Sequence, residues 1–174
     1  MAEQSMAEQS MSGVLYIVAG GAPLVARISG LITAARQRDW DPCLILTPTA
    51  ASWLAAEVPG LAELSGHPVR SAYKRPGEPD VLPPAQAMAV VPATFDMINK
   101  WAAGISDNLA LGLINEALGL PVPIVAVPIA NEPLARHPAW GASLATLRGA
   151  GVTLLDPADP PDQFPWPQLL DALP

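Results

Sequence analysis

Short runs of apolar residues recur along the chain, each followed by small or hydroxyl-bearing residues and then by a segment with helical spacing. The first run covers residues 14–18 and is closed by Gly20-Gly21, and the second covers residues 43–46. Because every position in these runs is apolar, they predict strands that are buried on both faces of a sheet. Such strands separated by helices specify an α/β fold, in which helices cover both faces of a mostly parallel sheet.

The same alternation continues to residue 155 and predicts a sheet of five or six strands. Further strands are expected at residues 87–91, 124–127 and 152–155, and helices at about 24–36, 52–56, 94–103, 106–119 and 138–147. Thr94 or Asp96 is expected to cap the third of these helices, and Ser106 or Asp107 the fourth. Ligands of such folds bind beyond the carboxyl ends of the strands, so the loops at that edge are the first places to search for a site.

Three parts of the chain differ from the rest in composition. Residues 1–12 contain Met-Ala-Glu-Gln-Ser twice and are expected to be a disordered extension, outside a domain that spans residues 13–156. Residues 66–86 are rich in proline and charge and are expected to form a long surface loop. Residues 157–174 contain six prolines, so this tail is expected to be mostly non-helical and to wrap around the surface or a neighbouring subunit.

The charge balance excludes one class of partner. The 174 residues include nine Lys and Arg against sixteen Asp and Glu, a net charge of −7, and no basic cluster is longer than Lys74-Arg75. Nucleic acid is therefore not an expected partner. Charged residues make up 14% of the chain, against about 25% in an average globular protein. So low a fraction predicts that part of the surface is covered, and a homo-oligomer is the simplest cover.

The counts of metal-binding and apolar residues narrow the possibilities further. The chain has one cysteine, Cys43, and two histidines. An intramolecular disulfide and a zinc site built on several thiolates are therefore excluded, and no metal site is expected. No uninterrupted apolar run reaches 18 residues, so no membrane partner is expected, and the cytoplasm is the expected compartment.

Three loops that follow predicted strands have the composition of a phosphate site: residues 19–22, 47–49 and 92–94. Small residues and hydroxyl groups there leave backbone N–H groups at helix N-termini open to an anion. The alternative is that Gly20-Gly21 is only a tight turn, because the chain has neither a complete Gly-x-Gly-x-x-Gly nor a Walker lysine. A dinucleotide would also need an acidic residue where Thr47 stands, so a mononucleotide such as FMN fits better than NAD.

Two ordered motifs and one shorter segment carry a specific resemblance. Residues 92–100 are Pro-Ala-Thr-Phe-Asp-Met-Ile-Asn-Lys, followed by Gly-Ile-Ser-Asp-Asn-Leu at 104–109, and residues 128–135 are Pro-Ile-Ala-Asn-Glu-Pro-Leu-Ala. They resemble the PASANT segment, its Gly-Ile-x-Asp continuation and the Pro-x-Met-Asn-x-x-Met-Trp motif of the homo-oligomeric flavin-containing cysteine decarboxylases. That family includes phosphopantothenoylcysteine decarboxylase and the lantibiotic peptidyl-cysteine decarboxylases. Residues 46–51 resemble its second-strand loop, and the likeness runs from about residue 14 to residue 155.

The resemblance implies a Rossmann-like three-layer sandwich that assembles as homotrimers, in some members further into dodecamers, with FMN near the subunit contacts. It also implies oxidative decarboxylation of a cysteine-like substrate, either a small molecule or the C-terminal cysteine of a peptide. In this reaction the thiol is oxidised to a thioaldehyde and the carboxylate then leaves. Carried over residue by residue, the FMN contacts are Gly20, Gly21, Ala22, Thr47, Thr49, Pro92, Ala93 and Thr94.

The chain departs from the family pattern at catalytic and substrate positions. Glu78 stands where the family has its catalytic histidine, and it is either a catalytic base or a solvated loop residue. Asn131 matches the residue that binds the substrate carboxylate, the alternative being an asparagine that satisfies backbone groups of its own loop. Asp96 replaces the asparagine of PASANT and either contacts substrate or caps a helix. Other side chains replace the methionines and tryptophan of the second motif, which predicts a pocket of different volume: Ala130, Leu134 and Ala135.

Three functions are compatible with these features. The first is an FMN-dependent enzyme that decarboxylates a cysteine-like substrate. The second is an FMN-binding protein of the same fold that lacks this activity and is either non-catalytic or has a different redox chemistry. The third is a regulatory subunit that binds no flavin. The missing histidine weighs against the first function, and the altered substrate motif favours the second.

Overall fold

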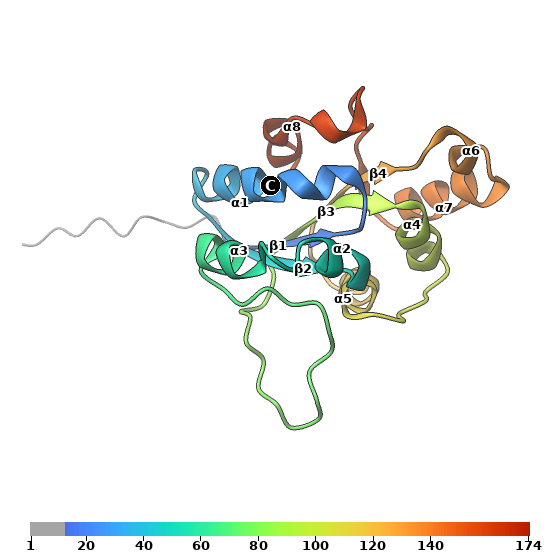
Figure 1. Cartoon of the computed structure of the whole chain (residues 1–174). Coiled ribbons are helices and arrows are strands. Elements are labelled where there is room, and N and C mark those ends of the chain that lie inside the picture. The colour runs from blue at the N-terminus through green and yellow to red at the C-terminus, as the bar shows by residue number, and fades with distance from the viewer. Residues whose placement is uncertain (1–12) are drawn as a thin grey trace, which may run out of the picture.

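Five parallel strands form a single sheet in the computed structural model, which describes residues 13–174 (Figure 1). The predicted extension at residues 1–12 lies outside the described residues. The strand order is β2-β1-β3-β4-β5, so β2 lies on one side of β1 and the later strands follow on the other. The strands are β1 (Gly13–Ala19), β2 (Trp40–Leu46), β3 (Ala87–Thr94), β4 (Ile124–Ile129) and β5 (Thr153–Leu154). The predicted α/β class and parallel sheet are confirmed.

Helices cover both faces of the sheet and produce two buried clusters (Figure 1). One cluster includes side chains of α1, α3 and α8, and the other includes side chains of α4, α5 and α7. The helices are α1 (Ile28–Arg36), α2 (Pro48–Trp53), α3 (Val58–Ser65), α4 (Phe95–Ala102), α5 (Leu109–Ala117), α6 (Glu132–Ala135), α7 (Pro138–Gly149) and α8 (Trp166–Asp171), with 3-10 turns at Pro23–Arg27 and Pro161–Gln163.

Strand β1 lies between β2 and β3, and both of its faces are buried. Leu15 and Ile17 pack into the first cluster, whereas Tyr16 and Val18 pack into the second. Successive side chains of a strand point to opposite faces, and here both faces are covered by helices. The apolar run therefore reports two-sided burial, as the sequence predicts.

Two predicted helix starts and one predicted strand end can be compared with the structure. Thr94 caps α4 by accepting a hydrogen bond from the backbone N–H of Met97. The prediction for α5 was wrong, because Asn108 is its cap and neither Ser106 nor Asp107 takes that place. Both are engaged elsewhere, Ser106 with the Asn115 amide and Asp107 with a lysine. Strand β3 also runs to Thr94 rather than ending at residue 91.

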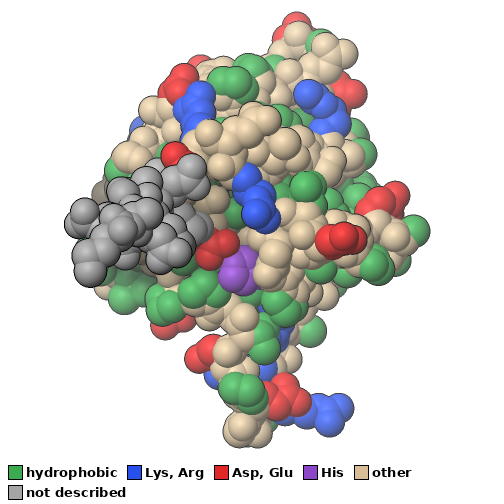
Figure 2. All heavy atoms as spheres, turned by 90° about the vertical axis from the view of Figure 1, so that its left-hand side faces the viewer, with side chains coloured by type: hydrophobic (Ala, Val, Ile, Leu, Met, Phe, Trp, Pro, Cys, Tyr) green, Lys and Arg blue, Asp and Glu red, His purple; other side chains and the backbone are tan. Residues whose placement is uncertain are grey.

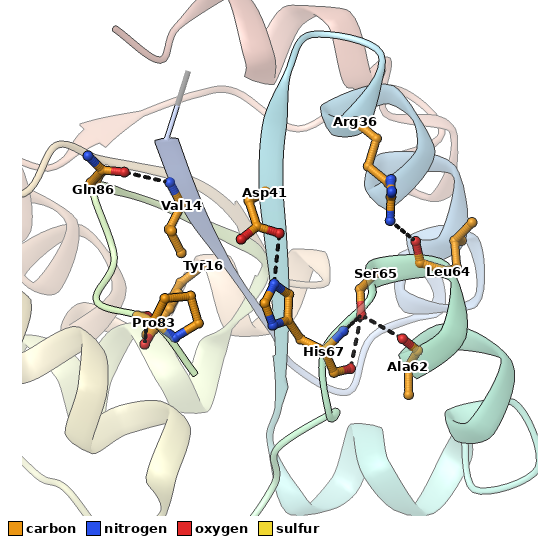
Figure 3. A network of polar contacts seen from close by, with 10 residues as sticks. All are labelled: Val14, Tyr16, Arg36, Asp41, Ala62, Leu64, Ser65, His67, Pro83 and Gln86. Atoms are coloured by element: carbon orange, nitrogen blue, oxygen red, sulfur yellow. Dashed lines mark hydrogen bonds and ion pairs between the residues drawn. The ribbon is translucent and has the colours of Figure 1, made fainter. Parts of the chain in front are cut away.

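The loop at residues 66–86 contains no helix or strand, as predicted, but both of its ends are fixed. His67 Nε2 lies 2.7 Å from Asp41 Oδ1, near the amino end of β2, and the Gln86 side chain accepts a hydrogen bond from the backbone N–H of Val14 in β1 (Figure 3). The Tyr16 hydroxyl donates to the carbonyl of Pro83 at 2.7 Å. These anchors hold the two ends of the loop near the amino ends of β1 and β2, and between them Arg70 pairs with Leu44 and Leu46 toward the carboxyl end of β2.

The proline-rich tail packs against its own subunit. Phe164, Trp166 and Leu169 are buried in the cluster that contains α1. Gly30 of α1 leaves room for the tail, since a Cβ there would come within 2.8 Å of the Trp166 indole nitrogen. The Arg27 guanidinium lies 5.8 Å from the centre of the same indole ring. The tail therefore shares the core of the sheet domain and carries a short helix, α8.

The surface at the amino ends of the strands shows acidic, basic and apolar side chains interspersed (Figure 2). No large area of one charge covers this face, in keeping with the scattered cations of the sequence. Of the helices in residues 13–174, none is both long enough and apolar enough to cross a membrane.

Candidate functional site

A cavity of about 710 Å³ lies beyond the carboxyl ends of β1, β2, β3 and β4. Its position spans the gap between β1 and β3, where the strand order reverses and where open α/β sheets bind their ligands. The volume is typical of small-molecule and cofactor sites. Seven of the residues predicted for FMN or substrate line it: Gly21, Ala22, Thr47, Thr49, Thr94, Asp96 and Asn131.

The glycine loop after β1 is built for close approach. The Gly20 N–H donates a 2.9 Å hydrogen bond to the carbonyl of Pro92, which joins this loop to the end of β3. A Cβ on Gly20 would come within 2.5 Å of Met97 Sδ, and one on Gly21 within 2.6 Å of Thr49 Cγ2. Only glycine fits either position without displacing a neighbour, so the backbone itself forms this wall of the cavity.

Four helices begin at the cavity, and a polar side chain caps each of them. Thr47, Thr94, Asn108 and Asn131 accept hydrogen bonds of 3.3, 3.3, 2.9 and 3.0 Å from backbone N–H groups of α2, α4, α5 and α6. The first N–H groups of a helix have no partner within it and carry partial positive charge. The site therefore directs several helix N-termini toward one space, an arrangement that favours an anionic group such as a phosphate.

Three charged side chains line the cavity and pair with one another: Lys100, Asp96 and Asp107. Lys100 Nζ lies 2.7 Å from Asp107 Oδ2 and 3.3 Å from Asp96 Oδ2. The hydrogen bond to Asp107, aided by Asp96, raises the pKa of Lys100 above its ordinary value, although desolvation acts in the opposite direction. Because two carboxylates already neutralise this ammonium group, a phosphate in the cavity would depend on backbone N–H and hydroxyl groups instead.

Aromatic rings stand behind one wall. Phe95 lines the cavity and stacks on Trp140 of α7, with ring centroids 5.8 Å apart and planes 20° apart. His137 approaches the same Phe95 ring edge-on at 5.6 Å. The row supplies an apolar surface next to the polar helix ends, as sites for flat aromatic ligands require.

Four of the predicted site residues do not line this cavity. Gly20, Pro92 and Ala93 are buried behind the lining, where they support the glycine loop and the end of β3. Glu78 lies on the exposed loop, where its carboxylate accepts a 2.9 Å hydrogen bond from the backbone N–H of Arg75. That loop has its own hollow of about 420 Å³, which Glu78 lines. Within one described chain, Glu78 and Asn131 are therefore in different places.

Some functional positions were missed by reasoning from sequence. Lys100, Asp107 and Asn108 all line the cavity, yet from sequence Lys100 and Asn108 were treated only as parts of a motif and Asp107 only as a candidate helix cap. The spacing of Asp96 and Lys100, four residues apart on one helix, was the signal that could have paired them. Pairing with Asp107 required knowing how the connection to α5 folds back over α4. Within residues 13–174, no group of three or more His, Cys, Asp or Glu side chains is arranged to hold a metal ion.

Sheet order, glycine loop and converging helix ends define an α/β protein with a nucleotide-type site at the reversal of strand order. The chain belongs to the Flavoprotein family, whose profile matches residues 3–162. The predicted relationship to the flavin-containing cysteine decarboxylases is confirmed by this match together with the relatives and structures that follow.

Curated relatives are longer than this chain. The coenzyme A biosynthesis bifunctional protein CoaBC of Vibrio vulnificus (strain YJ016) is 24% identical over 158 residues, which cover 86% of this chain and 38% of that protein. A cysteine/cysteine sulfinic acid decarboxylase of an unknown prokaryotic organism is 34% identical over 68 residues, 39% of this chain and 18% of its own length. The chain thus spans less than half of either relative.

Solved structures share the whole fold. MrsD from Bacillus sp. HIL-Y85/54728 superposes with a TM-score of 0.77 at 18% identity, covering 94% of this chain and 95% of that one. The FMN-dependent cysteine decarboxylase SpaF gives 0.73 at 18% identity, covering 84% and 85%. The cypemycin decarboxylase CypD gives 0.70 at 23% identity, covering 91% and 90%. At these identities the structures establish the Rossmann-like fold.

Proposed function

We propose that this chain binds FMN in the 710 Å³ cavity and oxidatively decarboxylates a cysteine-like substrate, either a small molecule or a peptide with a C-terminal cysteine. The observation that carries the proposal is that Asn131 lies in the same cavity as the glycine loop and the threonine loops. Two neighbours in fold, SpaF and TvaF, are FMN-dependent cysteine decarboxylases. The FMN contacts would come from Gly20, Gly21, Ala22, Thr47, Thr49, Pro92, Ala93 and Thr94.

The fit of the cavity to a flavin mononucleotide rests on its shape and its donors. Gly21 and Thr49 are in such close contact that a single added methyl group would disturb the wall. Backbone N–H groups at the starts of α2 and α4 suit a phosphate, while the Phe95 side of the cavity suits an aromatic ring system. Because Pro92 and Ala93 lie behind the lining, their part would be to hold the glycine loop in place.

The proposed reaction removes a hydride from the cysteine Cβ and the proton from its thiol, which yields a thioaldehyde. The bond between Cα and the carboxylate then breaks, carbon dioxide leaves, and the thiocarbonyl group takes the electron pair to give an enethiolate. FMN, when bound, supplies the oxidising equivalent by accepting the hydride.

Asn131 would hold the substrate carboxylate. Its Oδ1 accepts the N–H of Leu134, so its Nδ2 remains able to donate a hydrogen bond into the cavity. This capping hydrogen bond fixes the orientation of the Asn131 amide, so its Nδ2 group would point toward the substrate. Both interpretations made from the sequence, a capping residue and a carboxylate ligand, are compatible with this one side chain.

The test begins with the absorbance spectrum of the purified protein, with and without added FMN. The protein is then mixed without oxygen with peptides that end in cysteine, while the flavin band and released carbon dioxide are followed. Bound flavin that bleaches with release of carbon dioxide supports the proposal. A colourless protein that takes up no FMN contradicts it.

Asn131→Asp separates the two roles of Asn131. A carboxylate at this position still accepts the N–H of Leu134, so α6 keeps its cap, but the new charge repels the substrate carboxylate. We expect FMN binding to be retained and kcat/KM to fall at least a hundredfold, since one charge-assisted hydrogen bond is replaced by repulsion. Unchanged turnover would remove Asn131 from the substrate site.

A second candidate function is an FMN-binding protein without cysteine decarboxylase activity. It is favoured by the position of Glu78, which occupies the place of the family histidine yet lies outside the cavity of its own chain. Wild-type protein with bound flavin that no cysteine substrate bleaches favours the second function. If the wild type does turn over such substrates, a large loss of turnover in Glu78→Gln would require the loop to act on the cavity of a neighbouring subunit, whereas a normal rate would make Glu78 a solvated loop residue.

A further inference from the structure

One wall of the candidate FMN cavity carries a net negative charge. Among residues 13–174, the charged side chains that line the cavity are Asp96, Lys100 and Asp107. Lys100 Nζ lies 2.7 Å from Asp107 Oδ2 and 3.3 Å from Asp96 Oδ2, so one ammonium group faces two carboxylates. One negative charge is therefore left uncompensated on this wall before any ligand binds.

Asp96 is the carboxylate that Lys100 engages less closely. Asp107 accepts the 2.7 Å hydrogen bond from Lys100, whereas the contact with Asp96 is longer. The side chain of Asp96 is 66% exposed, against 31% for Lys100. Thr94 caps α4, so the Asp96 carboxylate is not required for that role. Its oxygens are therefore open to a ligand in the cavity.

The uncompensated charge discriminates between substrates by their own charge. The C-terminal cysteine of a peptide has a carboxylate and an amide N–H, so it adds negative charge to a wall that is already negative. Free cysteine has a carboxylate and an α-ammonium group, and these two charges cancel. Like charges in one site repel each other, whereas a carboxylate that accepts a hydrogen bond from an ammonium group gains a charge-assisted contact.

We propose that the Asp96 carboxylate binds the α-ammonium group of a free amino acid, so that the substrate of this chain is cysteine or a close analogue rather than a peptide. Asn131 would hold the carboxylate of the same molecule, since both residues line one cavity. Lys100 offsets one of the two carboxylates and leaves the other for the ligand. The inference rests on the proposed function for the reacting thiol.

The experiment measures binding rather than turnover. Isotope-labelled L-serine, which lacks the thiol that the reaction oxidises, is equilibrated by dialysis with the protein at pH 7 in the presence of FMN. The competitors are 3-hydroxypropanoate, which is serine without its ammonium group, and N-acetyl-L-serine, which has the amide of a peptide end. We expect serine to bind on the order of tenfold more tightly than either, the difference that one charge-assisted hydrogen bond gives.

Three results would overturn the proposal. The first is equal affinity for serine and 3-hydroxypropanoate, which would show that the ammonium group is not recognised. The second is tighter binding of N-acetyl-L-serine, which would make a peptide end the preferred ligand. The third is failure of labelled serine to bind.

Two variants locate the effect. Asp96→Asn keeps the size of the side chain and removes its charge, and it should lower the affinity for serine to that for 3-hydroxypropanoate. Glu132→Gln is the matched control, because Glu132 is exposed in α6, pairs with Arg136 and lies outside the lining of the cavity. This control should keep the wild-type preference. A preference that survives Asp96→Asn would overturn the proposal.

Asp107→Asn tests the balance of charge on the wall. With Asp107 neutral, Lys100 has one carboxylate partner, Asp96, and the wall has no net charge. The preference for serine should then fall below the wild-type value, although Asp107 itself is assigned no contact with the ligand. An unchanged preference would contradict the role assigned to Lys100.

The failure of this proposal can be told apart from failure of the proposed function. If peptides that end in cysteine bleach the flavin and release carbon dioxide, but serine is not preferred over 3-hydroxypropanoate, the inference is wrong and the activity stands. If serine is preferred and Asp96→Asn removes the preference, but neither cysteine nor a cysteine peptide is decarboxylated, the inference stands and the activity is wrong.

Discussion

Gly21 lines the candidate cavity and lies in close contact with Thr49 of the second loop. A Cβ there would meet the Thr49 methyl group at 2.6 Å, so Gly21→Ala should displace the second loop and weaken FMN binding at least tenfold. The fold should persist, because the clash lies at the cavity surface rather than in the core. Titration with FMN measures the loss, and circular dichroism checks the fold.

Adding Thr49→Ser to Gly21→Ala provides the matched control. Serine keeps the hydroxyl group and removes the methyl group that the new Cβ meets. We expect the double variant to recover part of the FMN affinity. If Gly21→Ala alone binds FMN as the wild type does, the contact between these two loops does not shape the site.

Cys43 shows what burial does to the single thiol of the chain. Desolvation, together with the nearby Asp41 carboxylate, raises the pKa of Cys43 to about 12 from an ordinary value of 9.0. An acid whose pKa is raised by folding stabilises the native state below its unfolded pKa, and this contribution is lost as the pH rises from 9 toward 12. The thiol should also resist alkylation in the native protein.

Urea unfolding at pH 8 and at pH 10.5 measures this prediction. The free energy of unfolding of the wild type should fall more between the two pH values than that of Cys43→Ala, by up to about 1.4 kcal/mol for each pH unit above 9. The pKa of Tyr16 is raised too, chiefly by desolvation and also by Cys43, so the difference between the two proteins measures the ionisation of Cys43 together with its effect on Tyr16. Equal falls would show that the thiol ionises as freely in the fold as in the unfolded chain.

At the scale of elements, the long loop is held to α5 by one side chain. The Tyr73 hydroxyl donates to the carbonyl of Asn108 at 3.0 Å and lies over Gly112, where a Cβ would overlap it. Gly112→Ala should therefore release the loop, although alanine itself favours the helix by about 1 kcal/mol. Trypsin should then cut after Lys74 several-fold faster than in the wild type, whereas the bond after Arg75 precedes Pro76 and resists trypsin.

The control for this prediction is Gly141→Ala in α7. No atom lies within 4 Å of a Cβ at that glycine, so the variant gains the same helix propensity without disturbing a contact. Its loop should be cut at the wild-type rate. Equal cutting of Gly112→Ala and Gly141→Ala would show that Tyr73 does not restrain the loop.

At the scale of the whole molecule, several surface elements bury little of their own apolar surface. Helix α6 has no buried residue, α7 buries only Leu147, and Trp53, Ile105 and Leu134 are between 38% and 56% exposed. Together with the low content of charge, this exposure favours a homo-oligomer that covers these helices. A dodecameric FMN-dependent decarboxylase from Escherichia coli O157:H7 has the same fold.

The oligomer is measured by light scattering of the purified chain. We expect a mass three or twelve times that of the subunit. The exposed face should be protected from hydrogen exchange at α6 and α7, as an interface requires. A monomer with rapid exchange in these helices would contradict the prediction.

Features that depend on neighbours along the chain could be predicted from sequence. The burial of β1, the Thr94 cap and the glycine loop each follow from a few adjacent residues. The cap of α5 could not, because Ser106 and Asp107 are capable caps that distant partners engage. The short helix in the tail was also missed, since its stability comes from packing of Trp166 against Gly30 rather than from helix propensity.

The sequence by itself determined the class of the fold, the order of its elements and the family to which the chain belongs. The alternation of strand-like and helix-like patterns and the short motifs involve residues close together in the sequence, so they can be recognised without knowing how the chain folds. Only the tertiary structure decided that Thr47, Thr94 and Asn131 share one cavity and that Glu78 lies apart from it. These facts depend on contacts between residues far apart in sequence, which are set by how the layers pack.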